Sequence, residues 1–124
     1  MALREQAQVV LVEDDAGVRQ ALARLLKAAG CEVQVFASAE ALMEAACARD
    51  ADCLILDIQL PGLSGFELQE ALERAGTRRP VIFITGHDEP AFRHKARSLE
   101  AAYLTKPLGG QALLEAIAAA ITPR

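Results

Sequence analysis

Apolar and polar positions along this chain alternate between two kinds of segment. Short, mostly apolar runs occupy residues 9–12, 53–57 and 81–85, and a more mixed run occupies 31–36. Short apolar runs bounded by turn residues are typical of buried strands. Between these runs, apolar residues recur every three or four positions, as they do along one face of a helix. The pattern predicts five strand–helix units, the fifth of which begins with a strand around 101–104.

Several residues mark where the predicted helices begin and end. Ser38 is a capping residue for one helix, and Ser64 with Glu67 forms a capping box at the start of another. Gly30 and Gly76 follow two helices, at positions where a left-handed residue ends a helix. The expected helices cover about 18–29, 38–46, 64–75, 90–98 and 113–121.

The predicted strands assemble into a parallel sheet. Strands joined through helices run mostly parallel with right-handed crossovers, and five such units form a three-layer α/β/α sandwich. The run 53–57 is the most apolar, which favours a central strand, whereas the mixed pattern of 31–36 favours a place near an edge.

Length, charge and cysteine content narrow the class of protein. The 124 residues suffice for one domain with a hydrophobic core. A formal net charge of −4 argues against direct nucleic-acid binding by this domain. No apolar run approaches the roughly 20 residues of a membrane span. Cys31, Cys47 and Cys53 lack metal-ligand spacing and are expected to be small buried side chains. We therefore expect a cytoplasmic domain with no membrane contact.

Chemically suggestive side chains occur where the predicted strands end. Glu13 and Asp14 follow the first strand, Asp57 ends the third, Thr85 ends the fourth, and Lys106 follows the fifth. The carboxyl ends of parallel strands lie on one rim of the sheet. Gathered carboxylates repel one another, so a lysine and a hard divalent cation, Mg²⁺ with Mn²⁺ as an alternative, are the expected counter-charges. A carboxylate can also attack phosphorus to form an aspartyl phosphate.

Four motifs at these strand ends together resemble one known family, the receiver domain of two-component response regulators. They are Glu13-Asp14, Asp57-x-x-Leu60-Pro61-x-Leu63-x-Gly65, Thr85-Gly86 and Lys106-Pro107. The resemblance covers about residues 8–121. Residues 84–88 (Ile-Thr-Gly-His-Asp) are most similar to the receivers of nitrogen-fixation-type two-domain transcriptional regulators.

The resemblance implies an overall organisation. The family's sheet has the strand order 2-1-3-4-5, the receiver or flavodoxin-like topology. The Lys106–Pro107 peptide bond is expected to be cis, as in the family. Residues 1–124 are expected to form a single receiver domain with a core of about 8–121, and with no output domain present in this chain.

The resemblance also implies a role for each site residue. Asp57 is expected to accept a phosphoryl group from a sensor histidine kinase or a small phosphodonor. Lys106 would pair with Asp57 or its phosphate, and Thr85 would bond a phosphoryl oxygen. Tyr103 stands where the family places the switch aromatic that turns inward when the threonine moves.

Metal binding and phosphate lifetime are assigned to neighbouring residues. Glu13, Asp14 and Asp57, with the backbone carbonyl of Gln59, are the expected Mg²⁺ ligands in the resemblance. The side chains of Gln59 and His87 lie two residues past Asp57 and Thr85, where the family tunes autodephosphorylation. We expect both to act on the water that attacks the acyl phosphate.

The expected output surface is the face made by the helix 90–98, the strand 101–104 and the last helix. Phosphorylation adds about −1.5 to −2 charge and would shift this face to control dimerisation, an output domain or a partner, with transcription as the regulated process. The basic run 93–97 is either a solvated face or a docking site.

Two departures from the family pattern carry structural expectations. Glu13 stands where aspartate is commoner, and its longer arm still offers oxygens. Residues 98–101 read Ser-Leu-Glu-Ala where the family has a Gly-Ala pair. Because a left-handed helix end without glycine is costly, we expect the helix 90–98 to end differently or to be mobile.

Rival functions remain open. An aspartate-nucleophile phosphatase shares these residue types but needs a second acid at the position of Gln59. A flavin-binding module needs a Ser/Thr/Gly-rich loop after the first strand, where Glu13 and Asp14 would repel phosphate instead. A phosphorylation-independent binding module would not need the intact acids, threonine and lysine. The favoured interpretation is a signalling switch that catalyses only its own phosphoryl transfer and autodephosphorylation, and is not an enzyme acting on outside substrates.

Overall fold

A computed structural model describes residues 7–121 of the chain. The strands are β1 (Gln8–Val12), β2 (Glu32–Phe36), β3 (Cys53–Asp57), β4 (Val81–Thr85) and β5 (Ala102–Thr105). The helices are α1 (Ala16–Ala28), α2 (Ala39–Ala45), α3 (Gly65–Arg74), α4 (Pro90–Ser98) and α5 (Gly110–Ile121), with a short 3₁₀ helix η1 (Ala48–Asp50) before β3. All the strand pairs are parallel, in the order β2-β1-β3-β4-β5. The predicted topology is therefore confirmed.

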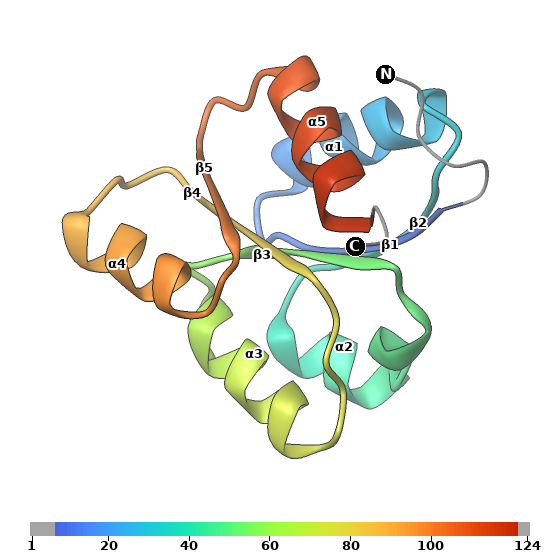
Figure 1. Ribbon diagram of the computed structural model, residues 1–124. Coiled ribbons are helices and arrows are strands. Elements are labelled where there is room, and N and C mark those ends of the chain that lie inside the picture. The colour runs from blue at the N-terminus through green and yellow to red at the C-terminus, as the bar shows by residue number, and fades with distance from the viewer. Residues whose placement is uncertain (1–6, 122–124) are drawn as a thin grey trace.

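Helices cover both faces of the sheet, α1 and α5 on one side and α2, α3 and α4 on the other (Figure 1). Successive strand side chains point to opposite faces. Val9 and Leu11 accordingly pack with α1 and α5, whereas Val10 and Val12 pack with α2 and α3. Each fully buried aliphatic side chain contributes roughly 1.5–3 kcal/mol to stability. The three-layer sandwich follows from this alternation.

Strand position matches the sequence pattern. Every residue of β3 is buried, and the strand lies third of the five. Strand β2 exposes Glu32, Gln34 and Val35 and lies at the edge. Both predictions are confirmed. Because Asp57 pairs with Ile84, the ends of β3 and β4 lie level at one rim of the sheet.

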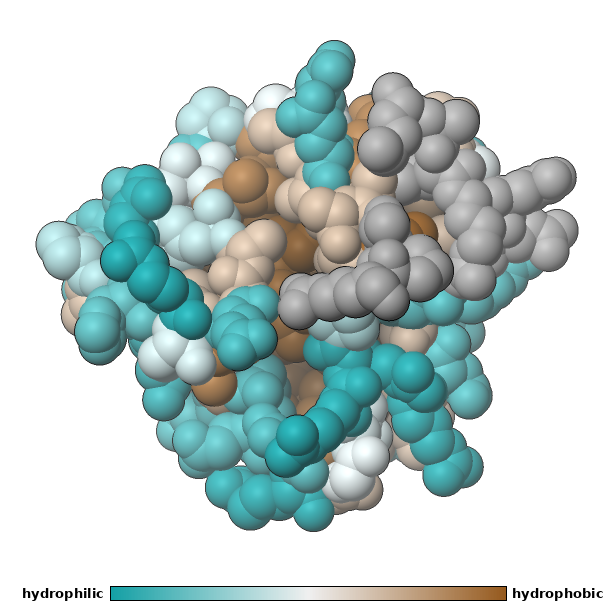
Figure 2. Space-filling view, in the orientation of Figure 1, coloured by the Kyte–Doolittle hydropathy of each residue, from teal (hydrophilic) through white to brown (hydrophobic). Residues whose placement is uncertain are grey.

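The surface is polar over much of the face seen in Figure 2, where hydrophilic side chains gather over α3 and α4. Among the large apolar residues described, Val35 and Met43 are the exposed ones. Within residues 7–121, no helix is both long and apolar enough to span a membrane. Cys31 and Cys53 are buried, as predicted, whereas Cys47 is only half-buried because it lies in the turn between α2 and η1. Burial raises the pKa of the Cys53 thiol to about 12.

The helix caps confirm several sequence signals. Ser38 accepts a hydrogen bond from the Ala41 N–H, and Ser64 with Glu67 forms the predicted capping box. Gly30 and Gly76 follow α1 and α3 with φ of +96° and +91°.

Helix α4 ends in the same way as α1 and α3, so the expectation of a different end was wrong. The Ala101 N–H donates to the Ala96 carbonyl, and the Glu100 N–H donates to the Arg97 carbonyl, each over 2.9 Å. Together these two bonds form a Schellman motif. Glu100 takes the left-handed position with φ of +56°. Hydrogen bonding at the helix end outweighs the cost of a side chain there.

This geometry predicts that Glu100→Gly stabilises the domain. Glycine relieves the left-handed strain in the folded state, and its greater conformational freedom in the unfolded chain offsets part of this gain. The net effect should raise the free energy of unfolding by roughly 0.5–1 kcal/mol. Urea denaturation measures the change. Glu100→Ala is the matched control, because it removes the carboxylate and keeps the strain. Equal stability of the two variants would contradict the prediction.

Candidate functional site

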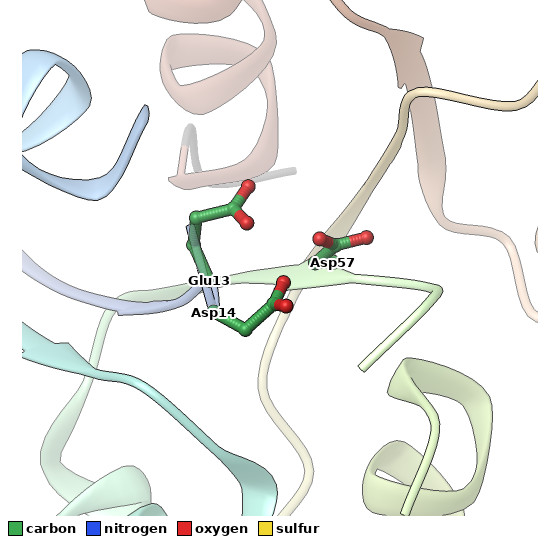
Figure 3. A group of neighbouring side chains, drawn as sticks. All are labelled: Glu13, Asp14 and Asp57. Atoms are coloured by element: carbon green, nitrogen blue, oxygen red, sulfur yellow. The ribbon is translucent and has the colours of Figure 1, made fainter. Parts of the chain in front are cut away.

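Three carboxylates meet at the rim of the sheet. Glu13 and Asp14 follow β1, and Asp57 is the last residue of β3. Each offers a carboxylate oxygen, and these oxygens all lie within 4.8 Å of one another (Figure 3). Glu13 and Asp57 are only 0% and 3% exposed, whereas Asp14 is exposed. The acids predicted from two separate strands therefore form one cluster with an open side.

Lys106 supplies the positive charge of this cluster. Its Nζ lies 2.6 Å from Glu13 Oε1 and 3.0 Å from Asp57 Oδ2. The Lys106 N–H donates to the Thr85 carbonyl over 2.8 Å, and the Lys106–Pro107 bond is cis, as the resemblance implied. Partial burial lowers the pKa of Lys106, but its bonds to Glu13 and Asp57 outweigh this and raise the pKa above its usual value. Lys106 therefore stays charged near neutral pH.

Glu13 is the most confined member of the cluster. Burial raises the pKa of its carboxyl group, against the lowering effect of the Lys106 ammonium. Oε2 accepts a hydrogen bond from the Asp15 N–H over 3.0 Å. Oε1 is buried and, within residues 7–121, lacks an aligned hydrogen-bond donor, so its contact with Lys106 is an ion pair. The longer arm of glutamate thus reaches the lysine directly.

The donor set fits a hard divalent cation. Glu13, Asp14 and Asp57 provide oxygen ligands, which Mg²⁺ and Mn²⁺ prefer. One lysine ammonium cannot balance three ionised carboxylates, and Glu13 Oε1 has spare capacity as an acceptor. A cation at this position would relieve the repulsion between the acids.

Gln59, Thr85 and His87 form a second group beside Asp57. The Gln59 N–H donates to Asp57 Oδ1 over 3.0 Å. Thr85 is fully buried, and its hydroxyl accepts from the His87 N–H over 3.0 Å and lies 3.3 Å from Gln59 Oε1. In the described part of the chain, the hydrogen bonds of this hydroxyl go to Gln59 and His87, not to Asp57. The His87 ring lies 3.0 Å from Glu89 Oε2.

Tyr103, the second residue of β5, is half-buried. Its hydroxyl donates to Asp88 Oδ1 over 2.8 Å, and Arg93 lies over its ring. Asp88 and Arg93 were not predicted to interact with Tyr103. Arg93 belonged to a basic run with two open interpretations, and nothing in the spacing of these residues indicates that they meet.

Backbone contacts hold the acidic loop and the end of β3 in place. Arg19 Nη1 donates to the carbonyls of Glu13 and Asp14 over 2.8 and 3.3 Å. This contact was missed because an arginine on a helix gives no sign of which backbone it reaches. Gly65 packs against the backbone of Asp57, where an added Cβ would collide with the carbonyl oxygen. Only glycine allows α3 to start so close to the β3 end.

The sequence matches the family described as "Response regulator receiver domain" over residues 9–118. It is 40% identical over 116 residues to Nodulation protein W of Bradyrhizobium diazoefficiens, covering 93% of this chain and 51% of that protein. It is 36% identical over 118 residues to Transcriptional regulatory protein FixJ of Azorhizobium caulinodans, covering 94% of this chain and 56% of that protein. The chain thus spans about half the length of these two relatives.

A solved structure gives the same result. A response regulator receiver protein from Burkholderia phymatum superposes with a TM-score of 0.80 at 38% identity, covering 94% of this chain and 95% of that chain. The predicted receiver fold is confirmed. The resemblance to receivers of nitrogen-fixation-type transcriptional regulators is confirmed as well, since FixJ is among the relatives.

The geometry of the acids predicts a specific metal response. Mg²⁺ should raise the melting temperature of the wild-type protein, since a ligand that binds the folded state at 100 times its Kd adds about 2.7 kcal/mol. Asp14→Asn removes one oxygen anion from the open side of the cluster, so most of this gain should be lost. Thermal unfolding with and without MgCl₂ measures it.

Asp15→Asn is the matched control for this experiment. It removes the same charge one residue away and keeps the α1 cap, in which Asp15 Oδ1 accepts from the Val18 N–H over 3.0 Å. It should retain the Mg²⁺ response. Equal responses from the two variants would show that Asp14 does not bind the ion.

Proposed function

We propose a specific role for this chain, which belongs to the response regulator receiver domain family of two-component systems: a switch in which Asp57 accepts a phosphoryl group from a sensor histidine kinase. The observation that carries the proposal is the Asp57 carboxylate, buried at the end of β3 in contact with Lys106 and clustered with the acids Glu13 and Asp14. Its Oδ1 accepts from the Gln59 N–H and its Oδ2 contacts Lys106, so the side chain is held in one orientation.

The chemical step is a phosphoryl transfer. An Asp57 carboxylate oxygen attacks the phosphorus of phosphohistidine, the new P–O bond forms, and the P–N bond breaks. The leaving imidazole nitrogen keeps the electron pair and takes a proton. Lys106 offsets the charge of the phosphoryl oxygens, which is the main contribution a protein makes to such a transfer.

Mg²⁺, or Mn²⁺ in its place, held by Glu13, Asp14, Asp57 and the Gln59 carbonyl, would neutralise charge on the phosphoryl oxygens and on the acids. The residues around Asp57 are already in place for an incoming phosphoryl group. Glu13 and Asp14 keep their side chains at the end of β1, and Gln59 keeps its backbone against Asp57 through the 3.0 Å hydrogen bond.

The conformational response starts at Thr85. Its hydroxyl would leave the His87 N–H and Gln59 to donate to a phosphoryl oxygen, and the loop that follows β4 would move with it. Tyr103 is the proposed second switch residue. The new charge of about −1.5 to −2 biases an equilibrium between two conformations instead of creating a new one.

We place the output on the surface formed by α4, β5 and α5. Movement of Thr85 and Tyr103 would change this surface and so control dimerisation, an output domain or a partner, with transcription as the regulated process and the cytoplasm as the location. Residues 1–124 would form one receiver domain. The basic side chains His94, Lys95 and Arg97 are exposed on α4, which suits either solvent or a partner.

A hydrolase acting on outside substrates is less consistent with the site. An aspartate-nucleophile phosphatase needs a second acid two residues after the nucleophile. Here that residue is Gln59, whose side chain lies against Thr85. We therefore propose that the domain catalyses only its own phosphoryl transfer and autodephosphorylation.

Incubation with acetyl phosphate and Mg²⁺, followed by intact mass measurement, tests the proposed function. The wild type should gain one phosphoryl group that is stable in acid and labile in base, as an acyl phosphate is. Asp57→Asn should gain none, and Asp50→Asn, on the surface helix η1, should behave like the wild type. A wild type that gains nothing, or an Asp57→Asn variant that is still modified, would refute the proposal.

The lifetime of this acyl phosphate should depend on Gln59 and His87. Gln59→Leu removes the amide that can orient water and should lengthen the lifetime by roughly 3- to 10-fold, the range expected for the loss of one hydrogen bond. His87→Ala should act in the same direction. Decay of the phosphorylated form, followed by mass, measures both. His94→Ala, an exposed histidine on α4, is the control, and lifetimes unchanged from this control would remove the hypothesis.

A further inference from the structure

Asp88 receives three hydrogen bonds from two different elements. Arg93 Nε and Nη2 donate to its two oxygens over 2.8 and 2.9 Å, and the Tyr103 hydroxyl donates to Oδ1 over 2.8 Å. The guanidinium carbon of Arg93 lies 4.8 Å from the centroid of the Tyr103 ring. The Glu89 N–H completes the group by donating to the Tyr103 hydroxyl over 3.4 Å. The β4–α4 loop, α4 and β5 are thus tied together at one point.

This network is coupled to the site through four residues of chain. Asp88 lies three residues after Thr85, and the hydroxyl of Thr85 is itself held by the His87 N–H over 3.0 Å. Both ends of the segment 85–88 are therefore fixed in the present conformation. A movement of Thr85 toward Asp57 pulls on this short segment and strains the contacts of Asp88.

Tyr103 is not closed in on all sides. One side of its ring packs against the apolar cluster that contains Phe83 and Ala96. Tyr103 and Arg93 also line an open groove of about 250 Å³ between α4 and β5. The hydroxyl contact with Asp88, more than steric confinement, fixes the ring at the surface.

We propose that Asp88 and Arg93 form a lock, defined as their bidentate pair together with the Tyr103 hydroxyl, which selectively holds the unphosphorylated conformation. The inference rests on the switch function proposed above. Asp88 and Arg93 are positioning residues, since they act through Tyr103 and the loop and not on the phosphoryl group. Their side chains are 46% and 54% exposed, so the contact is weak enough to open and close reversibly.

The test uses beryllofluoride with Mg²⁺ as a stand-in for the phosphoryl group. A ligand that binds only the unlocked conformation has an apparent Kd that falls as that conformation becomes more populated. Asp88→Ala, Arg93→Gln and Tyr103→Phe should each bind beryllofluoride more tightly than the wild type, by up to about 5-fold, the upper limit expected for breaking an exposed contact of this kind.

Arg97→Gln is the matched control, because it removes the same charge from the same exposed helix. Loss of a positive charge by itself weakens anion binding. Tighter binding of beryllofluoride by Arg93→Gln could therefore not be explained by the change in charge. A merely structural contact would lower the melting temperature without tightening the binding. The double variant Asp88→Ala/Arg93→Gln should bind no more tightly than either single variant, since both break one contact.

Tyr103 reports on the lock directly. The chain has one tyrosine and no tryptophan, so emission excited at a wavelength that its four phenylalanines do not absorb comes from Tyr103 alone. A carboxylate hydrogen-bonded to the phenol quenches this emission, and Asp88→Ala should raise it before any beryllofluoride is added. Variants that bind beryllofluoride no more tightly than Arg97→Gln would overturn the lock and leave the switch function standing. A wild type that binds none would overturn both.

Discussion

The ammonium group of Lys106, placed between the carboxylates of Glu13 and Asp57, is the interaction on which the site depends. Two carboxylates that are 0% and 3% exposed repel each other strongly unless a cation lies between them. Uncompensated, such a pair would favour protonation of one member, and a protonated carboxyl group is a poor nucleophile. The lysine supplies one positive charge, which leaves room in the cluster for a divalent ion. The excess of negative charge therefore destabilises the cluster when no ion is bound, and the same excess favours binding of a divalent cation.

The parallel sheet determines where this interaction can form. Val12 pairs with Leu56 and Thr85 pairs with Thr105, so the ends of β1, β3, β4 and β5 reach one rim. In a chain of alternating strands and helices, the loops that follow the strands lie at that rim. These loops can carry polar residues while the strands themselves remain apolar. Gly65 adds a local condition, since only a residue without Cβ lets α3 begin against the backbone of Asp57.

Much of this could be predicted from the sequence, because the relevant signals are local or periodic. The apolar run of β3 indicated a central strand, the Ser64–Glu67 capping box indicated the start of α3, and the acids at strand ends indicated a common rim. Contacts of long side chains that could reach several different partners could not be predicted. Nothing near Arg19 shows that it reaches the carbonyls of Glu13 and Asp14, and the left-handed conformation of Glu100 contradicts its own preference.

The placement of strong and weak contacts suits a reversible switch. The groups in the ion pairs of Lys106 are 20% exposed or less, so solvent and salt screen these pairs little. The contacts of Asp88 and Arg93 are about half exposed, where an ion pair is worth only about 0.2–1 kcal/mol. A ligand can shift an equilibrium only by its difference in affinity for the two states. If the lock were buried and worth several kcal/mol, breaking it would cost most of the free energy that one phosphoryl group can supply. Because the lock is exposed to solvent and weak, phosphorylation can shift the equilibrium between the two conformations.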